Sequence, residues 1–292
     1  MKKYFSKKDF IDMMLILSVL RVKTNCFDAE GKVIRARYLV CIDDDITSAF
    51  YAAYMYHLIY AVYGYYPFVL CVGGVGMLSK YTNEKGESEG LKLRRVCMEL
   101  GVASKDITVL DKGTNTGLNC LDIYKHLAKN PGRTIFCVTT RLSLRLERTF
   151  EFLPQQYPNE VNSEMFKMVK NAGLYWYVPE ETAKNMMQVY NCKGLAKGVM
   201  LLAEVASIYD RIVKYSGKLQ APLSFKVPDE VVQASLRLAK KYPLKINWLN
   251  FTGIWEYAYA YFSVLFYKPW IKRDSVRAVK HVKKQLKQEF GL

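Results

Sequence analysis

Short apolar runs that end at glycine, threonine or aspartate recur through the first half of the chain. The four runs predicted to be strands are residues 37–42, 68–72, 107–110 and 134–138. The segments between and after them have helical spacing, at residues 47–63, 87–100, 116–129 and 142–153. Parallel strands that are buried on both faces give continuous apolar runs, and a helix supplies the crossover between them. The pattern predicts an α/β fold with a Rossmann-like, doubly wound and mainly parallel sheet.

The pattern changes after Pro154, where helical spacing replaces the alternation of strands and helices. Helices are predicted at residues 163–172, 180–191, 198–215, 228–241 and 247–267. A further amphipathic helix is predicted at residues 6–23. We therefore expect an N-terminal helix within residues 1–36, a Rossmann-like core over 37–154, and a mainly helical C-terminal extension over 155–292 that packs on the core.

The composition is that of a folded protein in a reducing compartment. Apolar residues make up 51% of the chain and aromatic residues 14%, which excludes intrinsic disorder and can fill a sizeable core. The seven cysteines are an odd number without CxxC pairs, so neither a disulfide framework nor a zinc site is predicted. Most of them lie in apolar runs, where a thiol packs as a small hydrophobe. We expect a cytoplasmic protein.

The net charge of +16 suggests a nucleic-acid partner, but its distribution argues against one. Much of the excess lies in residues 268–287, where valines and a leucine recur at helical spacing between lysines and arginines. This pattern predicts a solvated basic face, with an anionic ligand, a membrane surface or nucleic acid as less favoured alternatives. Acidic residues interrupt the apolar segments near the N-terminus and at 251–267, so neither a signal peptide nor a membrane span is predicted.

The loops that follow the four predicted strands form the candidate site, because ligands bind at the carboxyl ends of parallel strands. The first loop begins with three aspartates, the second with glycines, the third contains Thr-Asn-Thr, and the fourth begins Thr-Thr-Arg. A glutamate and an arginine lie in the helices after the second and fourth strands. The predicted ligand-binding residues are Asp43, Asp44, Asp45, Gly73, Gly74, Glu89, Asn115, Thr116, Asn119, Thr139, Thr140, Arg141 and Arg145.

Each of these groups has a ligand chemistry and a purely structural alternative. The glycines allow close backbone approach to a ligand, or form a simple tight turn. The Asn-Thr residues can hold polar or anionic groups at a helix start, or only cap the helix. The aspartates can bind a metal, a ribose or an amine, and the arginines, with Arg148, can hold a carboxylate or phosphate or pair with nearby glutamates. The three histidines lie far apart and beside no nucleophile, so catalytic residues are not assigned.

Together these motifs resemble the YdcF-like family, a bacterial domain family without a firmly assigned reaction. The matching segments are Gly73-Gly74, Ser88-Glu89-Gly90, Gly101-Val102, the run from Asp111 to Asn119, and Val138-Thr139-Thr140 followed by Arg145 or Arg148. The chain departs from the family pattern at Asp43–Asp45, where the family tends to have Gly-Gly. It also has Asp111 and Leu118 in the place of glutamates, and Leu142-Ser143 where a histidine is often found.

The resemblance implies a Rossmann-like fold that binds S-adenosylmethionine or a similar nucleotide-like ligand, in the longer cytoplasmic form of the family. We therefore expect a binding protein for a small polar ligand at the strand ends. The alternative is an enzyme, a hydrolase or transferase acting on a phosphate- or nucleotide-bearing substrate. In that case Asp43–Asp45 and Glu89 would be the acid–base or metal groups. The sequence does not decide between binding and turnover, and it gives no oligomeric state.

Overall fold

A five-stranded parallel sheet forms the centre of the computed structural model, which describes residues 6–19, 25–42, 46–75, 86–129, 135–138, 143–177, 209, 212–241 and 276–292. The strands are β1 (Tyr38–Ile42), β2 (Phe68–Val72), β3 (Ile107–Leu110), β4 (Ile135–Val138) and β5 (Leu174–Tyr177). Their order is β3-β2-β1-β4-β5, so β1 is central and pairs with β2 on one side and β4 on the other. The predicted α/β fold with a parallel sheet is confirmed.

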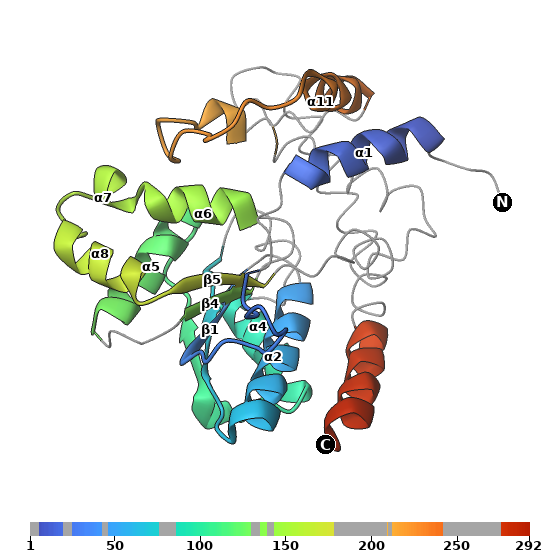
Figure 1. Ribbon diagram of the computed structural model, residues 1–292, viewed down its shortest axis with the longest axis vertical. Helices are drawn as coiled ribbons and strands as arrows, with labels where there is room; N and C mark the ends of the chain where they lie inside the picture. The colour runs from blue at the N-terminus through green and yellow to red at the C-terminus, as the bar shows by residue number, and fades with distance from the viewer. Residues whose placement is uncertain are drawn as a thin grey trace.

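Helices connect the strands and cover both faces of the sheet (Figure 1). They are α1 (Lys7–Val19), α2 (Thr47–Tyr63), α4 (Glu89–Glu99), α5 (Thr116–Lys129), α6 (Ser143–Glu151), α7 (Leu153–Gln156), α8 (Ser163–Asn171), α11 (Asp229–Lys241) and a helix over residues 276–290. A single 3-10 turn, Ser104–Asp106, leads into β3. The helices α2 and α4 cover one face, whereas α5, α6, α7 and α8 cover the other.

Alternate side chains of β1 and of β2 fill two separate cores. Leu39 and Val69 pack against α2 and α4, and Val40 and Leu70 pack against the helices of the opposite face. All four side chains are buried. The strands therefore have continuous apolar sequences because successive residues each face a layer of helices.

One local feature differs from the sequence prediction. The strand β5 lies in the region predicted to be mainly helical, and it pairs in parallel with β4. The helix α2 begins at Thr47, as predicted, and its N-cap, Ile46, makes no side-chain capping bond. Its end is as predicted, because Gly64 closes it in the left-handed conformation with φ of 72°.

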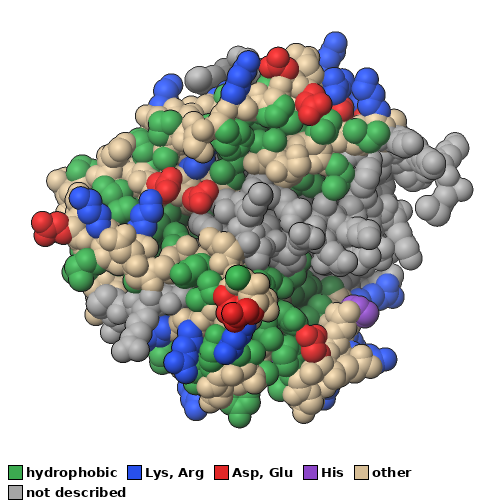
Figure 2. Space-filling model, viewed as in Figure 1, with side chains coloured by type: hydrophobic (Ala, Val, Ile, Leu, Met, Phe, Trp, Pro, Cys, Tyr) green, Lys and Arg blue, Asp and Glu red, His purple; other side chains and the backbone are tan. Residues whose placement is uncertain are grey.

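The C-terminal helix packs on α2 through its apolar side. Val279 and Leu286 are buried, and the Phe290 ring lies 5.6 Å from that of Tyr54 and 5.8 Å from that of His57. The exposed lysines of this helix are Lys280, Lys283, Lys284 and Lys287. The predicted amphipathic helix is thus confirmed over residues 276–290, with its described lysines on the exposed side. On the face drawn in Figure 2, the lysines and arginines of the described residues are scattered rather than gathered in one patch.

Buried carboxylates fasten α1 to α11, and the two helices lie side by side (Figure 1). Asp12 accepts two hydrogen bonds from the Arg237 guanidinium, at 2.9 and 2.7 Å, and Asp9 pairs with Lys241 at 2.6 Å. The predicted N-terminal helix therefore packs against the C-terminal region. No helix among the described residues is both long and apolar enough to cross a bilayer. The predicted helices at 180–191 and 247–267, and most of that at 198–215, lie outside the described residues.

The two-sided core predicts the effect of truncating a central strand residue. Leu39→Ala should lower the free energy of unfolding by about 2–5 kcal/mol, because Leu39 is 0% exposed and its removal leaves a cavity. The matched control is Leu236→Ala on α11, where the side chain is 58% exposed and the change should stay within about 0.5 kcal/mol. Urea denaturation followed by circular dichroism measures both. Equal losses in the two variants would contradict the assignment of β1 to the centre of the sheet.

Candidate functional site

Main-chain hydrogen bonds join the end of β2 to the start of α4. The Gly73 N–H donates to the Leu110 carbonyl of β3 at 2.9 Å, and the Gly90 N–H donates to the Gly73 carbonyl at 2.7 Å. Ser88 is the N-cap of α4, and its hydroxyl accepts from the Leu91 N–H at 3.1 Å. The first turn of α4 therefore lies directly at the carboxyl end of β2, where the sequence placed part of the site.

Glycine is required at three positions because the backbones approach more closely than a Cβ atom permits. A Cβ at Gly74 would lie 2.6 Å from the carbonyl oxygen of Gly113, and one at Gly90 would lie 2.8 Å from that of Cys71. A Cβ at Gly113 would overlap the side chain of Asn119. These glycines do more than form a tight turn, since they let the loops after β2 and β3 and the start of α4 touch.

The loop after β3 brings the start of α5 to the same place. The Gly74 N–H donates to the Gly113 carbonyl at 2.7 Å, which fixes this loop against the end of β2. Asn115 caps α5, because its Oδ1 accepts from the Leu118 N–H at 3.1 Å. Thr116 is the first residue of the helix and is partly exposed.

Asn119 has a different role from that of the cap. Its side chain is only 7% exposed, and its Oδ1 has no hydrogen-bond partner among the described residues. A buried acceptor without a partner costs about 1–3 kcal/mol, so the position is unfavourable for stability alone. This amide lies against Gly113 at the strand ends. It is therefore the described side chain best suited to accept a hydrogen bond from a ligand.

The carboxylate of Glu89 lies over Gly73. A Cβ at Gly73, whose φ is 133°, would be 2.7 Å from Glu89 Oε2 and 2.8 Å from the Glu89 Cβ. Glu89 is also in the first turn of α4, where the helix dipole stabilises a negative charge. The strand ends thus carry the Glu89 carboxylate beside two helix N-termini, an arrangement that suits a ligand with both cationic and anionic groups.

The two described arginines of α6 have different environments. Arg148 is buried, donates to the Ala221 carbonyl at 2.7 Å and to the Ile212 carbonyl at 3.1 Å, and its pKa is lowered by burial. The Arg148 guanidinium therefore anchors the segment around residues 212–221 through Nε and Nη1, while its Nη2 has no hydrogen-bond partner among the described residues. Arg145 lies near α5, where its charge opposes the rise to about 12 that burial causes in the pKa of Cys120.

The structure brings together only some of the predicted site residues. Those that it places at the strand ends are Gly73, Gly74, Glu89, Asn115, Thr116 and Asn119. Those that lie outside the described residues are Asp43, Asp44, Asp45, Thr139, Thr140 and Arg141. The prediction omitted Gly90 and Gly113, whose importance depends on contacts between segments distant in sequence. In the sequence, Gly90 stands out only as a glycine at a predicted helix start, and Gly113 only as the glycine before the Thr-Asn-Thr run.

A second surface feature occurs on α1, where an apolar hollow of about 370 Å³ is lined by Ile11, Met14, Leu15 and Ser18. None of these side chains is ionisable, and none belongs to the strand ends. Its one polar lining side chain is that of Ser18, whose hydroxyl donates to the Leu15 carbonyl, so we do not include the hollow in the candidate site.

Comparisons with protein-family models, with curated proteins and with solved structures found no match to this chain. The resemblance to the YdcF-like family therefore rests on the motif residues alone. Among these, Gly73, Gly74, Glu89 and Asn119 lie together at the strand ends.

Two neighbouring asparagines allow capping to be separated from ligand binding by stability alone. Asn115→Ala removes the cap of α5 and should cost about 1 kcal/mol. Asn119→Ala removes an acceptor that has no partner among the described residues, so it should leave the free energy of unfolding nearly unchanged or raise it. Chemical denaturation of the unliganded protein measures both variants. A loss at Asn119 as large as that at Asn115 would return Asn119 to a structural role.

Proposed function

We propose that the chain is a Rossmann-like, doubly wound protein of the YdcF-like type that binds a small nucleotide-like ligand at its strand ends, with S-adenosylmethionine as the first candidate. The observation that carries this proposal is the unpartnered, buried Oδ1 of Asn119, which lies where the starts of α4 and α5 meet the ends of β2 and β3. An acceptor in this position needs a donor from outside the described residues.

The strand order supports the fold assignment and the placement of the ligand. The chain moves outward from β1 to β3 and then continues on the opposite side with β4 and β5. In open α/β sheets a ligand binds in the crevice where the direction reverses, which here lies between β1 and β4. The loops that follow these strands contain the predicted residues Asp43–Asp45 and Thr139–Arg141. A ligand that extends from this crevice over β2 would reach Gly73 and Asn119.

The chemistry of the described side chains favours a zwitterionic adenosyl ligand over a polyphosphate. S-adenosylmethionine has an ammonium group, a sulfonium, ribose hydroxyls and an adenine amine, each of which can interact with Glu89 or donate to Asn119. Its carboxylate suits a helix N-terminus. A nucleoside triphosphate would instead bring several negative charges towards the carboxylate of Glu89, and would need a metal ion to offset them.

The hydrolase or transferase alternative rests on that same carboxylate. Glu89 can serve as an acid–base group or metal ligand if a phosphate-bearing substrate enters with a divalent cation. Binding of nucleotides that requires Mg²⁺, with slow turnover, would favour this alternative over the binding protein.

A thermal-shift screen tests the proposal directly. S-adenosylmethionine at 100 times its Kd should stabilise the protein by about 2.7 kcal/mol, whereas nucleotides without Mg²⁺ should not. Asn119→Ala should weaken the binding measured by calorimetry by about tenfold, which corresponds to one lost hydrogen bond. The matched control is Asn115→Ala. Under conditions where this variant is fully folded, it should bind S-adenosylmethionine as tightly as the unmodified chain does. Unchanged binding in Asn119→Ala, or no response to any adenosyl compound, would refute the proposed ligand site.

A further inference from the structure

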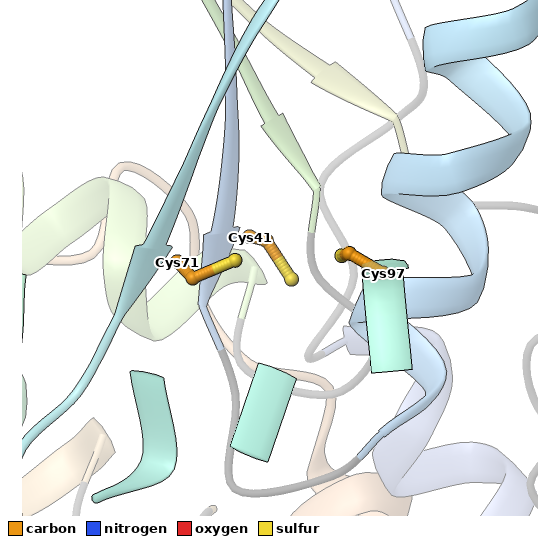
Figure 3. A group of neighbouring side chains, drawn as sticks. All are labelled: Cys41, Cys71 and Cys97. Carbon is orange, nitrogen blue, oxygen red and sulfur yellow. The ribbon is translucent and has the colours of Figure 1, made fainter. Parts of the chain in front are cut away.

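Three cysteines from separate elements meet in the core beneath the strand ends. They are Cys41 on β1, Cys71 on β2 and Cys97 on α4, and Figure 3 shows their side chains converging. Their sulfur atoms all lie within 4.8 Å of one another. Each residue is 0% exposed. The ligand site proposed above uses none of these side chains, although α4 borders both.

Rigid elements hold the three sulfurs in place. Cys41 and Cys71 are partners in the parallel register of β1 and β2, so their side chains project side by side from the same face of the sheet. The helix α4 covers that face and supplies Cys97. The start of α2 borders the cluster, since the Cys41 sulfur lies 3.5 Å from the Ser48 hydroxyl and the Cys97 thiol donates to the Ala49 carbonyl at 3.9 Å.

We propose that Cys41, Cys71 and Cys97 bind one soft, thiophilic metal ion. A metal–sulfur bond of about 2.3 Å places three sulfurs around a central ion about 4 Å apart. The sulfur separations in the cluster, none of which exceeds 4.8 Å, are compatible with this spacing. Small rotations of the side chains would complete the geometry without moving a strand.

The donor atoms decide the class of ion. Three sulfurs suit Zn²⁺, Cd²⁺ or Cu⁺, whereas Mg²⁺ and Ca²⁺ require oxygen ligands. Each thiol that binds releases its proton to water, so three thiolates around a divalent ion leave one net negative charge. The N-terminal end of α2 is a source of positive potential beside the cluster.

The cluster lies close to the carboxyl ends of β1 and β2. Cys41 and Cys71 each lie one residue before the end of their strands. A Cβ at Gly90 would touch the Cys71 carbonyl, so the first turn of α4 directly adjoins the cluster. Cys120 provides a control for the cluster, because it is also buried but belongs to the core on the opposite face of the sheet.

The experiment uses the full chain, reduced, stripped of metal and kept anaerobic. Zn²⁺, Cd²⁺ and Cu⁺ are titrated separately against chromophoric chelators, with Mg²⁺ as the hard control. At least one soft ion should bind at one per chain, produce an ultraviolet thiolate-to-metal charge-transfer band and raise the melting temperature. Cys97→Ala should weaken binding by about hundredfold or more, beyond the effect of losing an outer-shell contact. Cys120→Ala, the matched control, should bind as the unmodified chain does.

Two results would overturn the inference. One is a folded chain that binds no soft ion, and the other is Cys97→Ala binding as well as Cys120→Ala. If Cys97→Ala does not fold, X-ray absorption on the unmodified chain decides the matter. Three sulfur neighbours around the ion would support the site, and two or fewer would refute it.

Discussion

The close contact of three backbone segments at the ends of β2 and β3 is the constraint on which the rest of the site depends. Two main-chain hydrogen bonds of 2.7 Å, from Gly74 to Gly113 and from Gly90 to Gly73, hold the segments together. Side chains at these positions would collide with backbone or with Asn119, so the contact exists only with glycine. One consequence is that the starts of α4 and α5 converge at one edge of the sheet. Their positive ends face a common region, which the carboxylate of Glu89 partly offsets.

The two-sided core makes this convergence possible. Because β1 is central and buried on both faces, the strand ends are fixed by packing from two helix layers. Buried contacts of this kind keep loops in position without many interactions of their own. The hydrogen bonds of Arg148 to the Ala221 and Ile212 carbonyls and the ion pairs between α1 and α11 hold further distant segments together. These polar side chains, far from the strand ends, therefore stabilise the packing of distant segments.

Much of the fold could be predicted from the sequence, but contacts between distant segments could not. The first four strands are short apolar runs bounded by glycine or polar residues, which is a strong local signal. The strand β5 has only four residues, Leu174–Tyr177, within a helix-rich region, so its pairing with β4 decides its structure. Arg148 shares a helical face with Arg145 by spacing, yet its partners lie at Ile212 and Ala221. Sequence spacing gives no information about such partners.

The cysteine cluster could not be predicted from the sequence either, because the sequence motifs of metal sites have ligands that are close in sequence. Cys41, Cys71 and Cys97 are separated by whole strands and helices, and only the register of β1 with β2 and the packing of α4 bring them together. The same helix start that approaches the end of β2 through Gly90 therefore borders both the ligand site above and the sulfur cluster below. An ion held by β1, β2 and α4 would resist their separation. It would thereby keep Glu89 and the glycine contacts in the arrangement that ligand binding requires.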